Sequence, residues 1–184
     1  MRVVPWETDE PLWRIHRAEN PALWYGPAVG ETPRGRFDAP DAEYRICYLG
    51  GSPAAAFVET MLRGRRHRLI TRATLQARVI TRVDALRPPR LAQLDGIGLA
   101  MMGVGGDTVH DADYAASRRL ALAAFRRDPR IDGLRYRSRW DDDCFCVAVF
   151  DRAGGAVNAK PEGERLDRAA VIRTSIERYR VGIV

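Results

Sequence analysis

The chain has 184 residues, of which 46% are hydrophobic and 29% charged, and its formal net charge is +6. This is the composition of an ordinary globular protein, and residues 1–184 are most simply one domain that buries roughly 70% of its unfolded surface. No apolar run approaches the roughly 20 residues of a membrane span, and MRVVPWETDE is not a secretory signal, so we expect a cytoplasmic protein without a membrane partner.

The positive charge comes almost entirely from arginine, since Lys160 is the only lysine. A GC-rich genome produces such a bias as readily as a binding surface does. No RNP, zinc-finger or clear helix-turn-helix pattern accompanies the charge, so direct binding of nucleic acid is only an alternative interpretation.

Redox and metal sites are not expected from the cysteines and histidines. Cys47, Cys144 and Cys146 lie in apolar, strand-like segments, which predicts buried free thiols rather than disulfides or metal ligands. The histidines lie far apart and lack HExxH spacing, so we expect no metal site.

The N-terminal half predicts short strands around one clear helix. Glycines and prolines indicate a loop over residues 20–33. An alanine-rich helix follows Pro53 and ends near residue 64, with Glu59 off its apolar face. Arg65–Arg68 is a basic cluster typical of a solvated turn. The strands are predicted at residues 12–15, 44–49, 69–75 and 78–83.

The next part of the chain predicts two helices with a glycine-rich connection. Residues 91–100 are expected to form a short helix. GVGG at residues 103–106 lacks the GKS or GKT of a phosphate loop, so it is interpreted as a mobile connection. The most regular helix is predicted at residues 114–127, with Asp111 or Asp113 as its cap.

The last part of the chain predicts the centre of the fold. Residues 144–150 form a continuous apolar run, which indicates a fully buried central strand. A final helix is expected at about residues 164–177. Short strands with a few helices on their flanks predict an α+β fold.

Three chemically distinct side chains lie on adjoining elements between residues 36 and 59. The guanidinium of Arg36 suits a phosphate, the ring of Tyr48 suits stacking, and the carboxylate of Glu59 suits a developing cation. Together these groups suit a dinucleotide. Taken singly, each has a plainer interpretation: a surface arginine paired with Asp38 or Asp41, a core tyrosine and a solvent-facing glutamate.

Ordered motifs along the chain resemble a known family. They are WRI at residues 13–15, GRF at 35–37, YLG at 48–50 with Glu59 beyond it, and IDG at 131–133 followed by Ser138. In this order they resemble the RES domain, which is named for its arginine, glutamate and serine. The resemblance covers nearly the whole chain from Trp13 onward.

The resemblance implies a fold and a set of site residues. The fold would be a mixed, mostly antiparallel β core flanked by helices, like that of ADP-ribosyltransferases. Its arginine falls on Arg36, its tyrosine on Tyr48, its glutamate on Glu59 and its serine on Ser138. Arg36, Tyr48 and Ser138 would bind NAD as the substrate, Glu59 would stabilise the ribosyl cation, and no metal is implied.

The resemblance also implies partners and an activity. Many RES proteins are toxins of bacterial toxin–antitoxin pairs, so the implied partners are NAD and an Xre-type antitoxin, through which nucleic acid is contacted indirectly. The first interpretation is an NAD-consuming toxin that cleaves the nicotinamide–ribose bond by hydrolysis or phosphorolysis. The alternatives are a mono-ADP-ribosyltransferase acting on a host protein and a basic nucleic-acid-binding module.

Two residues depart from the family pattern. Asp38 stands where the family often has asparagine, and Arg137 stands where it often has proline. Asp38 is expected to add negative charge near Arg36, and Arg137 to add positive charge near Ser138.

Overall fold

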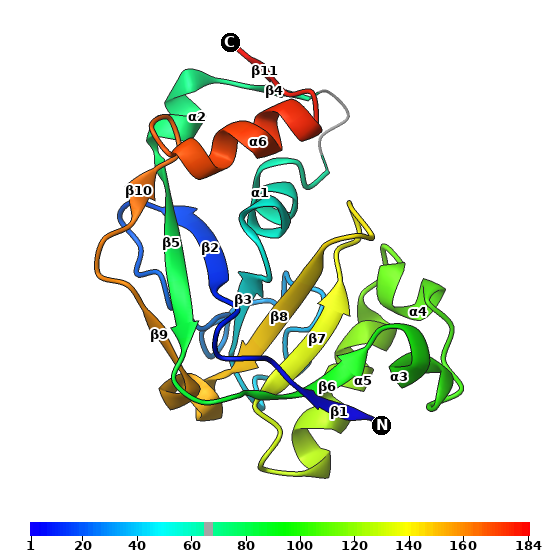
Figure 1. The fold of residues 1–184 in the computed structure, drawn as a ribbon. Helices are drawn as coiled ribbons and strands as arrows, with labels where there is room; N and C mark the ends of the chain where they lie inside the picture. The colour runs from blue at the N-terminus through cyan, green and yellow to red at the C-terminus, as the bar shows by residue number, and fades with distance from the viewer. Residues whose placement is uncertain (65–67) are drawn as a thin grey trace.

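Nine strands form one sheet through the protein in the computed structural model, which describes residues 1–64 and 68–184 (Figure 1). The order is β1-β6-β7-β8-β3-β2-β5-β10, and β9 pairs with β5. Every described pairing in this sheet is antiparallel except that of β6 with β7. The strands are β1 (Val3–Pro5), β2 (Leu12–Arg17), β3 (Ile46–Gly50), β5 (Arg78–Ala85), β6 (Arg90–Leu94), β7 (Gly133–Arg137), β8 (Phe145–Phe150), β9 (Val157–Ala159) and β10 (Glu164–Arg165).

Two groups of helices flank the sheet, which confirms the predicted α+β fold. The helices are α1 (Pro53–Met61), α2 (Arg72–Gln76), α3 (Gly96–Ala100), α4 (Asp107–His110), α5 (Ala115–Arg127), α6 (Ala170–Arg178) and the 3-10 helix η1 (Asp151–Ala156). In Figure 1, α1 and α6 pack together near β2, whereas α3, α4 and α5 lie beside β6 and β7. A smaller parallel sheet joins β4 (Leu69–Ile70) to β11 (Gly182–Ile183).

β8 is the buried centre of the sheet, as its apolar sequence predicts. It pairs with β3 on one side and with β7 on the other. Successive side chains of a strand point to opposite faces, and here both faces are covered. Cys146, Ala148 and Phe150 enter one hydrophobic core, and Val147 and Val149 enter another. Burial on both faces explains why the sequence of β8 lacks polar alternation.

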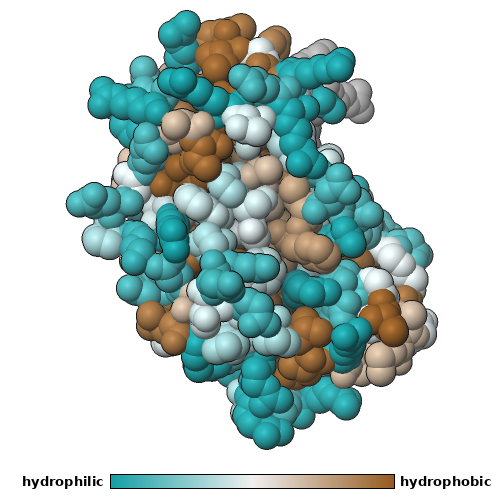
Figure 2. Space-filling view, in the orientation of Figure 1, coloured by the Kyte–Doolittle hydropathy of each residue, from teal (hydrophilic) through white to brown (hydrophobic). Residues whose placement is uncertain are grey.

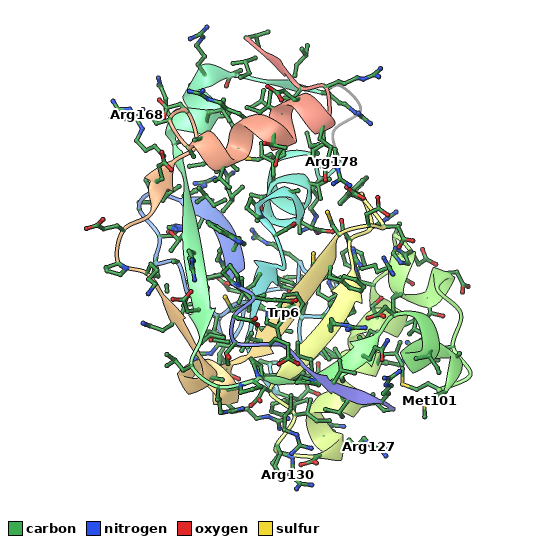
Figure 3. The ribbon with its side chains drawn as sticks, viewed as in Figure 1. Trp6, Met101, Arg127, Arg130, Arg168 and Arg178 are labelled. Carbon is green, nitrogen blue, oxygen red and sulfur yellow. The ribbon has the colours of Figure 1, made fainter. Side chains whose placement is uncertain are left out.

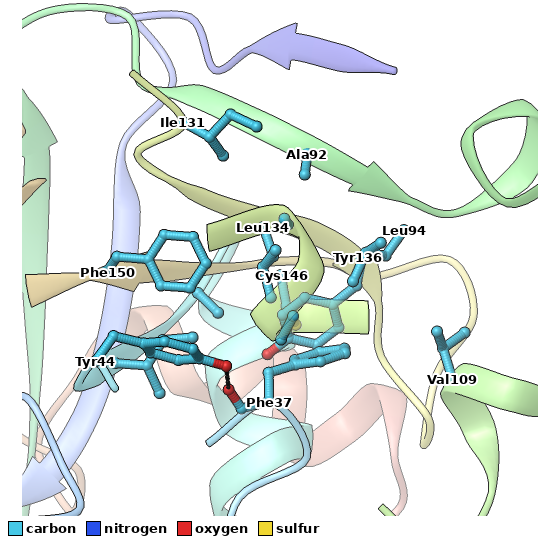
Figure 4. Close-up of a cluster of buried hydrophobic side chains, with 14 of the residues drawn as sticks. Phe37, Tyr44, Ala92, Leu94, Val109, Ile131, Leu134, Tyr136, Cys146 and Phe150 are labelled. Carbon is cyan, nitrogen blue, oxygen red and sulfur yellow. Dashed lines mark hydrogen bonds between the residues drawn. The ribbon is translucent and has the colours of Figure 1, made fainter. Parts of the chain in front are cut away.

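An aromatic cluster fixes the loop that precedes β3 (Figure 4). The hydroxyl of Tyr44 donates to the carbonyl of Phe37 at 2.8 Å. The ring of Phe37 meets that of Tyr136 edge-on with centroids 4.7 Å apart, and Tyr44 meets Phe150 in the same way at 4.8 Å. All of these rings are buried, so the backbone next to Arg36 is held rigidly.

β2 and β3 are neighbours in the sheet, yet they pair at only one position. Trp13 lies opposite Gly50. In contrast, β2 matches β5 at six positions and β3 matches β8 at five. The two strands therefore diverge from this Trp13–Gly50 seam and leave a cleft between them.

Local sequence places α1 directly beyond the seam. Ser52 accepts a hydrogen bond from the first turn of the helix at 3.1 Å, and Pro53 occupies a position where no amide hydrogen is needed. A Cβ at Gly50 would lie 2.4 Å from a backbone nitrogen of α1, so glycine is required for this close approach. The turn therefore sets Glu59, six residues beyond Pro53 in α1, beside the cleft.

Residues 69–75 do not form the single strand predicted from the sequence. They form β4 and then α2, because the side chain of Thr71 accepts a hydrogen bond from the Thr74 amide and caps a helix. Of the basic cluster Arg65–Arg68, residues 65–67 lie outside the described part of the chain. Arg68 donates to the carbonyl of Tyr179 at 2.9 Å.

Two predicted helices also begin elsewhere. Residues 91–100 are β6 followed by α3, and the final helix starts at Ala170, after β10. Short apolar runs do not distinguish a buried strand from a helix, which explains the first error. In the second, residues 164–165 pair with β5 as β10 before the helix begins. The helix predicted at residues 114–127 is confirmed as α5. The predicted cap is wrong, because Tyr114 occupies the N-cap position, while Asp113 accepts a hydrogen bond from the Ala115 amide at 2.9 Å.

Hydrophilic side chains cover most of the visible face in Figure 2. The brown patch at its top lies over the C-terminal segment, where Ile183 and Val184 are exposed. In Figure 3, Arg127 and Arg130 project at the lower end, whereas Arg168 lies at the upper end. Positive charge is therefore spread around the molecule.

Among residues 1–64 and 68–184, no helix has the length and apolar character that a membrane crossing requires. Over the same residues, no group of three or more His, Cys, Asp or Glu side chains could hold a metal ion. Cys47, Cys144 and Cys146 are buried and free, as predicted.

Candidate active site

A cavity of about 270 Å³, here named the active-site cavity, opens where β2 and β3 diverge. Side chains from β2, β3 and α1 line it, together with the loop that carries Gly35. Arg36, Tyr48 and Glu59 all belong to its lining. Ser138 does not, but it lies directly behind Glu59, to which it is hydrogen-bonded. The structure therefore brings the four predicted residues together.

The carboxylate of Glu59 is held through one of its two oxygens. Oε1 accepts hydrogen bonds from the Ser138 hydroxyl at 2.7 Å and from the Arg139 amide at 3.2 Å. Nη2 of Arg36 lies 3.9 Å from the same atom. Within the described residues, Oε2 receives no hydrogen bond. The side chain is 23% exposed, so Oε2 is available to a ligand in the active-site cavity.

Arg36 is buried rather than on the surface, which corrects the plainer interpretation of its sequence position. It is 7% exposed, and its guanidinium lies 5.6 Å from the ring centroid of Phe37 and 5.3 Å from that of Tyr136. Its ion-pair partner among the described residues is Glu59, not Asp38 or Asp41. A cation held between two rings loses little further freedom when it binds an anion.

The ring of Tyr48 lines the active-site cavity, while its hydroxyl is enclosed by the loop before β3. That hydroxyl donates to Asp38 at 2.8 Å and accepts from the Phe37 amide at 2.9 Å. Burial, followed by the negative charge of Asp38, raises the pKa of Tyr48 well above its ordinary value. Tyr48 is thus a structural link through its hydroxyl and a cavity wall through its ring.

Asp38 ties the GRF loop together rather than placing charge on Arg36. Its Oδ2 accepts hydrogen bonds from the amides of Arg34 at 2.8 Å and Gly35 at 2.5 Å, and its Oδ1 accepts from Tyr48. A Cβ at Gly35 would lie 2.4 Å from both Asp38 and the Tyr48 hydroxyl. Glycine is therefore required where this loop meets β3.

Removing the Tyr48 hydroxyl should destabilise the fold. Tyr48→Phe leaves buried Asp38 and the Phe37 amide without their partner, which costs about 1–3 kcal/mol of unfolding free energy. Urea denaturation measures this loss. Tyr114→Phe, which removes an exposed contact to Arg63, should change the value by less than about 0.5 kcal/mol. A Tyr48→Phe protein as stable as the parent would contradict the structural link.

Ser138 forms a turn and orients Glu59 at the same time. Its Oγ accepts from the amides of Trp140 at 3.1 Å and Asp141 at 3.3 Å, which leaves its proton for Glu59. The guanidinium of Arg137 binds the Asp142 carbonyl and lies 4.4 Å from the ring centroid of Phe145. The positive charge of Arg137 is therefore engaged away from Ser138.

Ser138→Ala should lower kcat about tenfold and change KM little, because it removes one hydrogen bond that orients Glu59. Steady-state kinetics with NAD, the substrate that the family resemblance implies, measure both constants. Ser117→Ala is the matched control, since this buried serine donates to the Thr108 carbonyl and does not line the active-site cavity. Equal kcat values for Ser138→Ala and the parent would exclude the orienting role.

Sequence reasoning did not assign a role to several side chains of the cavity. Arg14, the central residue of the WRI motif, lines it and donates to the carbonyls of Tyr48 and Trp24, each at 3.4 Å. Tyr136 and Trp140 also line it. Of these three residues, Arg14 alone belongs to one of the motifs singled out in the sequence, WRI.

Comparison with known proteins identifies the family. The family model described as the RES domain matches residues 11–169. The chain belongs to the RES domain family. The protein named "Probable toxin y4kH" of Sinorhizobium fredii (strain NBRC 101917 / NGR234) is 28% identical to this RES protein over 112 residues, which is 61% of this chain and 87% of that protein.

The fold of this RES protein is also found in a solved structure. A chain of the M. tuberculosis MbcT–MbcA toxin–antitoxin complex superimposes with a TM-score of 0.66 at 17% identity. The match covers 86% of this chain and 84% of the other. At this identity the likeness concerns the fold.

Proposed function

We propose that this RES protein is the toxin of a bacterial toxin–antitoxin pair and that it consumes NAD by cleaving the nicotinamide–ribose bond. Family membership, the name of the Sinorhizobium relative and the fold shared with a toxin–antitoxin complex support the toxin assignment. The observation that carries the NAD assignment is Glu59, which is anchored through Oε1 and has Oε2 available in a cavity that Arg36 also lines.

The chemistry fits a single anchored carboxylate. When the bond between ribose C1′ and the nicotinamide nitrogen breaks, its electron pair goes to the ring, and nicotinamide leaves as a neutral molecule. The ribose then carries positive charge, as in glycoside cleavage. Oε2 of Glu59 supplies the opposite charge from a fixed position, so little reorganisation is needed during the reaction.

Arg36 and Tyr48 position the dinucleotide. Arg36 binds the pyrophosphate with the N–H groups that remain after its contacts to Glu59 and the Arg137 carbonyl. The ring of Tyr48 stacks on nicotinamide, and its hydroxyl bonds keep the ring in place.

The nucleophile comes from outside the protein. Ser138 donates its proton to Glu59 and does not line the active-site cavity, so its hydroxyl orients the carboxylate and is not placed to attack C1′. Water adds to C1′ and releases a proton to give ADP-ribose, whereas inorganic phosphate gives a phosphorylated ADP-ribose. A protein side chain in the same role would make the enzyme a mono-ADP-ribosyltransferase.

The proposal includes a partner and a place of action. An Xre-type antitoxin would cover the active-site cavity and contact nucleic acid on behalf of the pair. The substrate is a cytoplasmic metabolite, so the toxin acts in the cytoplasm. Direct nucleic-acid binding is less favoured because Arg130 pairs with Asp128 and Arg178 pairs with Asp141, and the two arginines lie far apart in Figure 3.

Incubating the purified protein with NAD, with and without phosphate, tests the activity. Proton NMR should detect free nicotinamide together with ADP-ribose or its phosphorylated form. Transfer of the ADP-ribose label to a protein would support the alternative enzyme. NAD that stays intact at high enzyme concentration would refute the proposal.

Expression in bacteria tests the toxin assignment. Growth should stop only after intracellular NAD has fallen. NAD that stays constant while growth stops would show that another activity causes the arrest.

A further inference from the structure

A second cavity adjoins the active-site cavity along β2. It has a volume of about 220 Å³ and is here named the β2 groove. Arg14 and Ile15 line both cavities, which makes them neighbours. The β2 groove continues from these residues toward the end of β2, where the backbone of Arg17 lies opposite that of Arg78 in β5. It therefore extends the cleft that begins at the Trp13–Gly50 seam.

Trp24 gives the β2 groove an aromatic wall that is both exposed and fixed. The side chain is 48% exposed. Its six-membered ring lies so close to Gly26 that a Cβ there would be 2.1 Å from it. Gly26 is bonded in turn to Ile46 at the start of β3, with N–O distances of 3.0 and 3.1 Å. An exposed ring that is already immobilised suits stacking on a planar ligand.

The charged side chains that line the β2 groove are all basic. Arg14, Arg17 and Arg78 belong to its lining, and no carboxylate does. Glu19 lies 3.6 Å from Arg17, but both side chains are more than 60% exposed, so the pair is weak. Both ring nitrogens of His16 are within 2.9 Å of other protein atoms, so His16 is a fixed wall. A ligand of this groove should combine phosphate with an aromatic base.

We propose that the β2 groove binds the adenosine-phosphate half of NAD, with Trp24 stacking on adenine and the arginines binding phosphate. This inference rests on the proposed function. Sites for small molecules typically occupy about 300–1,000 Å³. The active-site cavity of about 270 Å³ is below that range, but both cavities together fall inside it. Nicotinamide riboside phosphate fills the first, and the adenylate fills the second.

Comparing NAD with nicotinamide mononucleotide, which lacks the adenylate, tests the groove. Stacking on one base is worth about 1–3 kcal/mol, so Trp24→Ala should lower kcat/KM for NAD about five- to a hundredfold. The loss for nicotinamide mononucleotide should be at least several-fold smaller. Trp24→Phe should restore most of the NAD value. Equal losses for the two substrates, or no loss for NAD, would overturn the inference.

Calorimetry with adenosine monophosphate separates this inference from the proposed function, since it needs no catalysis. The parent should bind this ligand, and Trp24→Ala and Arg17→Ala should each bind it at least fivefold more weakly. Arg119→Ala on α5 removes an exposed arginine outside both cavities and should bind as the parent does. If NAD is not cleaved but these losses appear, the groove stands and the activity fails. If the parent does not bind adenosine monophosphate, the groove assignment fails.

Discussion

Replacing Glu59 with glutamine is expected to lower the turnover of NAD by about 10²–10³, the loss seen when one preorganised electrostatic group is removed. The ribose becomes cationic mainly in the transition state, so a neutral amide should lower kcat while binding of the ground state changes little. Glutamine keeps an oxygen that can accept from Ser138 and the Arg139 amide, so the fold should persist. Nicotinamide release and ADP-ribose calorimetry measure the two effects.

The matched control is Glu43→Gln. Glu43 is 20% exposed, against 23% for Glu59, and pairs with Arg126 at 3.2 Å outside the active-site cavity. This variant should turn over NAD like the parent. Parental turnover in Glu59→Gln would remove the basis of the mechanism. Weak ADP-ribose binding by Glu59→Gln would instead identify Glu59 as a ground-state ligand of the ribose.

Arg36→Ala is expected to weaken ADP-ribose binding ten- to over a hundredfold, since a charge-assisted phosphate contact is worth about 1.5–3 kcal/mol. The variant should also melt several degrees lower, because Arg36 is buried between Phe37 and Tyr136. Arg36→Lys should recover only part of the affinity, because an ammonium lacks the planar fork of donors. Calorimetry and thermal unfolding measure the two losses.

A control must separate lost stability from lost affinity. Arg135 pairs with Asp95 at 3.0 Å and lies 4.8 Å from the ring centroid of Phe145, so it is held much as Arg36 is. It does not line the active-site cavity. Arg135→Ala should therefore melt lower and still bind ADP-ribose normally. If Arg36→Ala binds as tightly as Arg135→Ala, Arg36 has no role in binding.

The sequence predicted the parts of the fold whose signals are local. The uninterrupted apolar run of β8 predicts a buried strand, and the apolar residues of α5 recur at helical spacing, which predicts a helix. The turn residues 50–53 predict both the end of β3 and the start of α1. For the same reason the order of the family motifs located Arg36, Tyr48, Glu59 and Ser138 before their distances were known.

Features that depend on tertiary contacts were not predictable in this way. Arg36 next to Asp38 resembles a surface ion pair in sequence. In the structure Arg36 pairs with Glu59 of α1, whereas Asp38 is held by two amides of its own loop and by Tyr48 of β3. Thr71 turns a strand-like run into a helix by capping it. The β2 groove joins Trp24 to residues 16, 17 and 78, and no sequence spacing reports that arrangement.

The sparse pairing at the Trp13–Gly50 seam also determines how firmly β2 and β3 are held together beside the active-site cavity. Because one ladder position joins β2 to β3, separating the two strands breaks one backbone pairing rather than a whole row of them. Other contacts span the gap: Arg14 of β2 donates to the Cys47 sulfur and the Tyr48 carbonyl of β3, and α1 packs on both strands. The width of the active-site cavity should therefore depend on these few contacts, while the pairings of β2 with β5 and of β3 with β8 are unchanged.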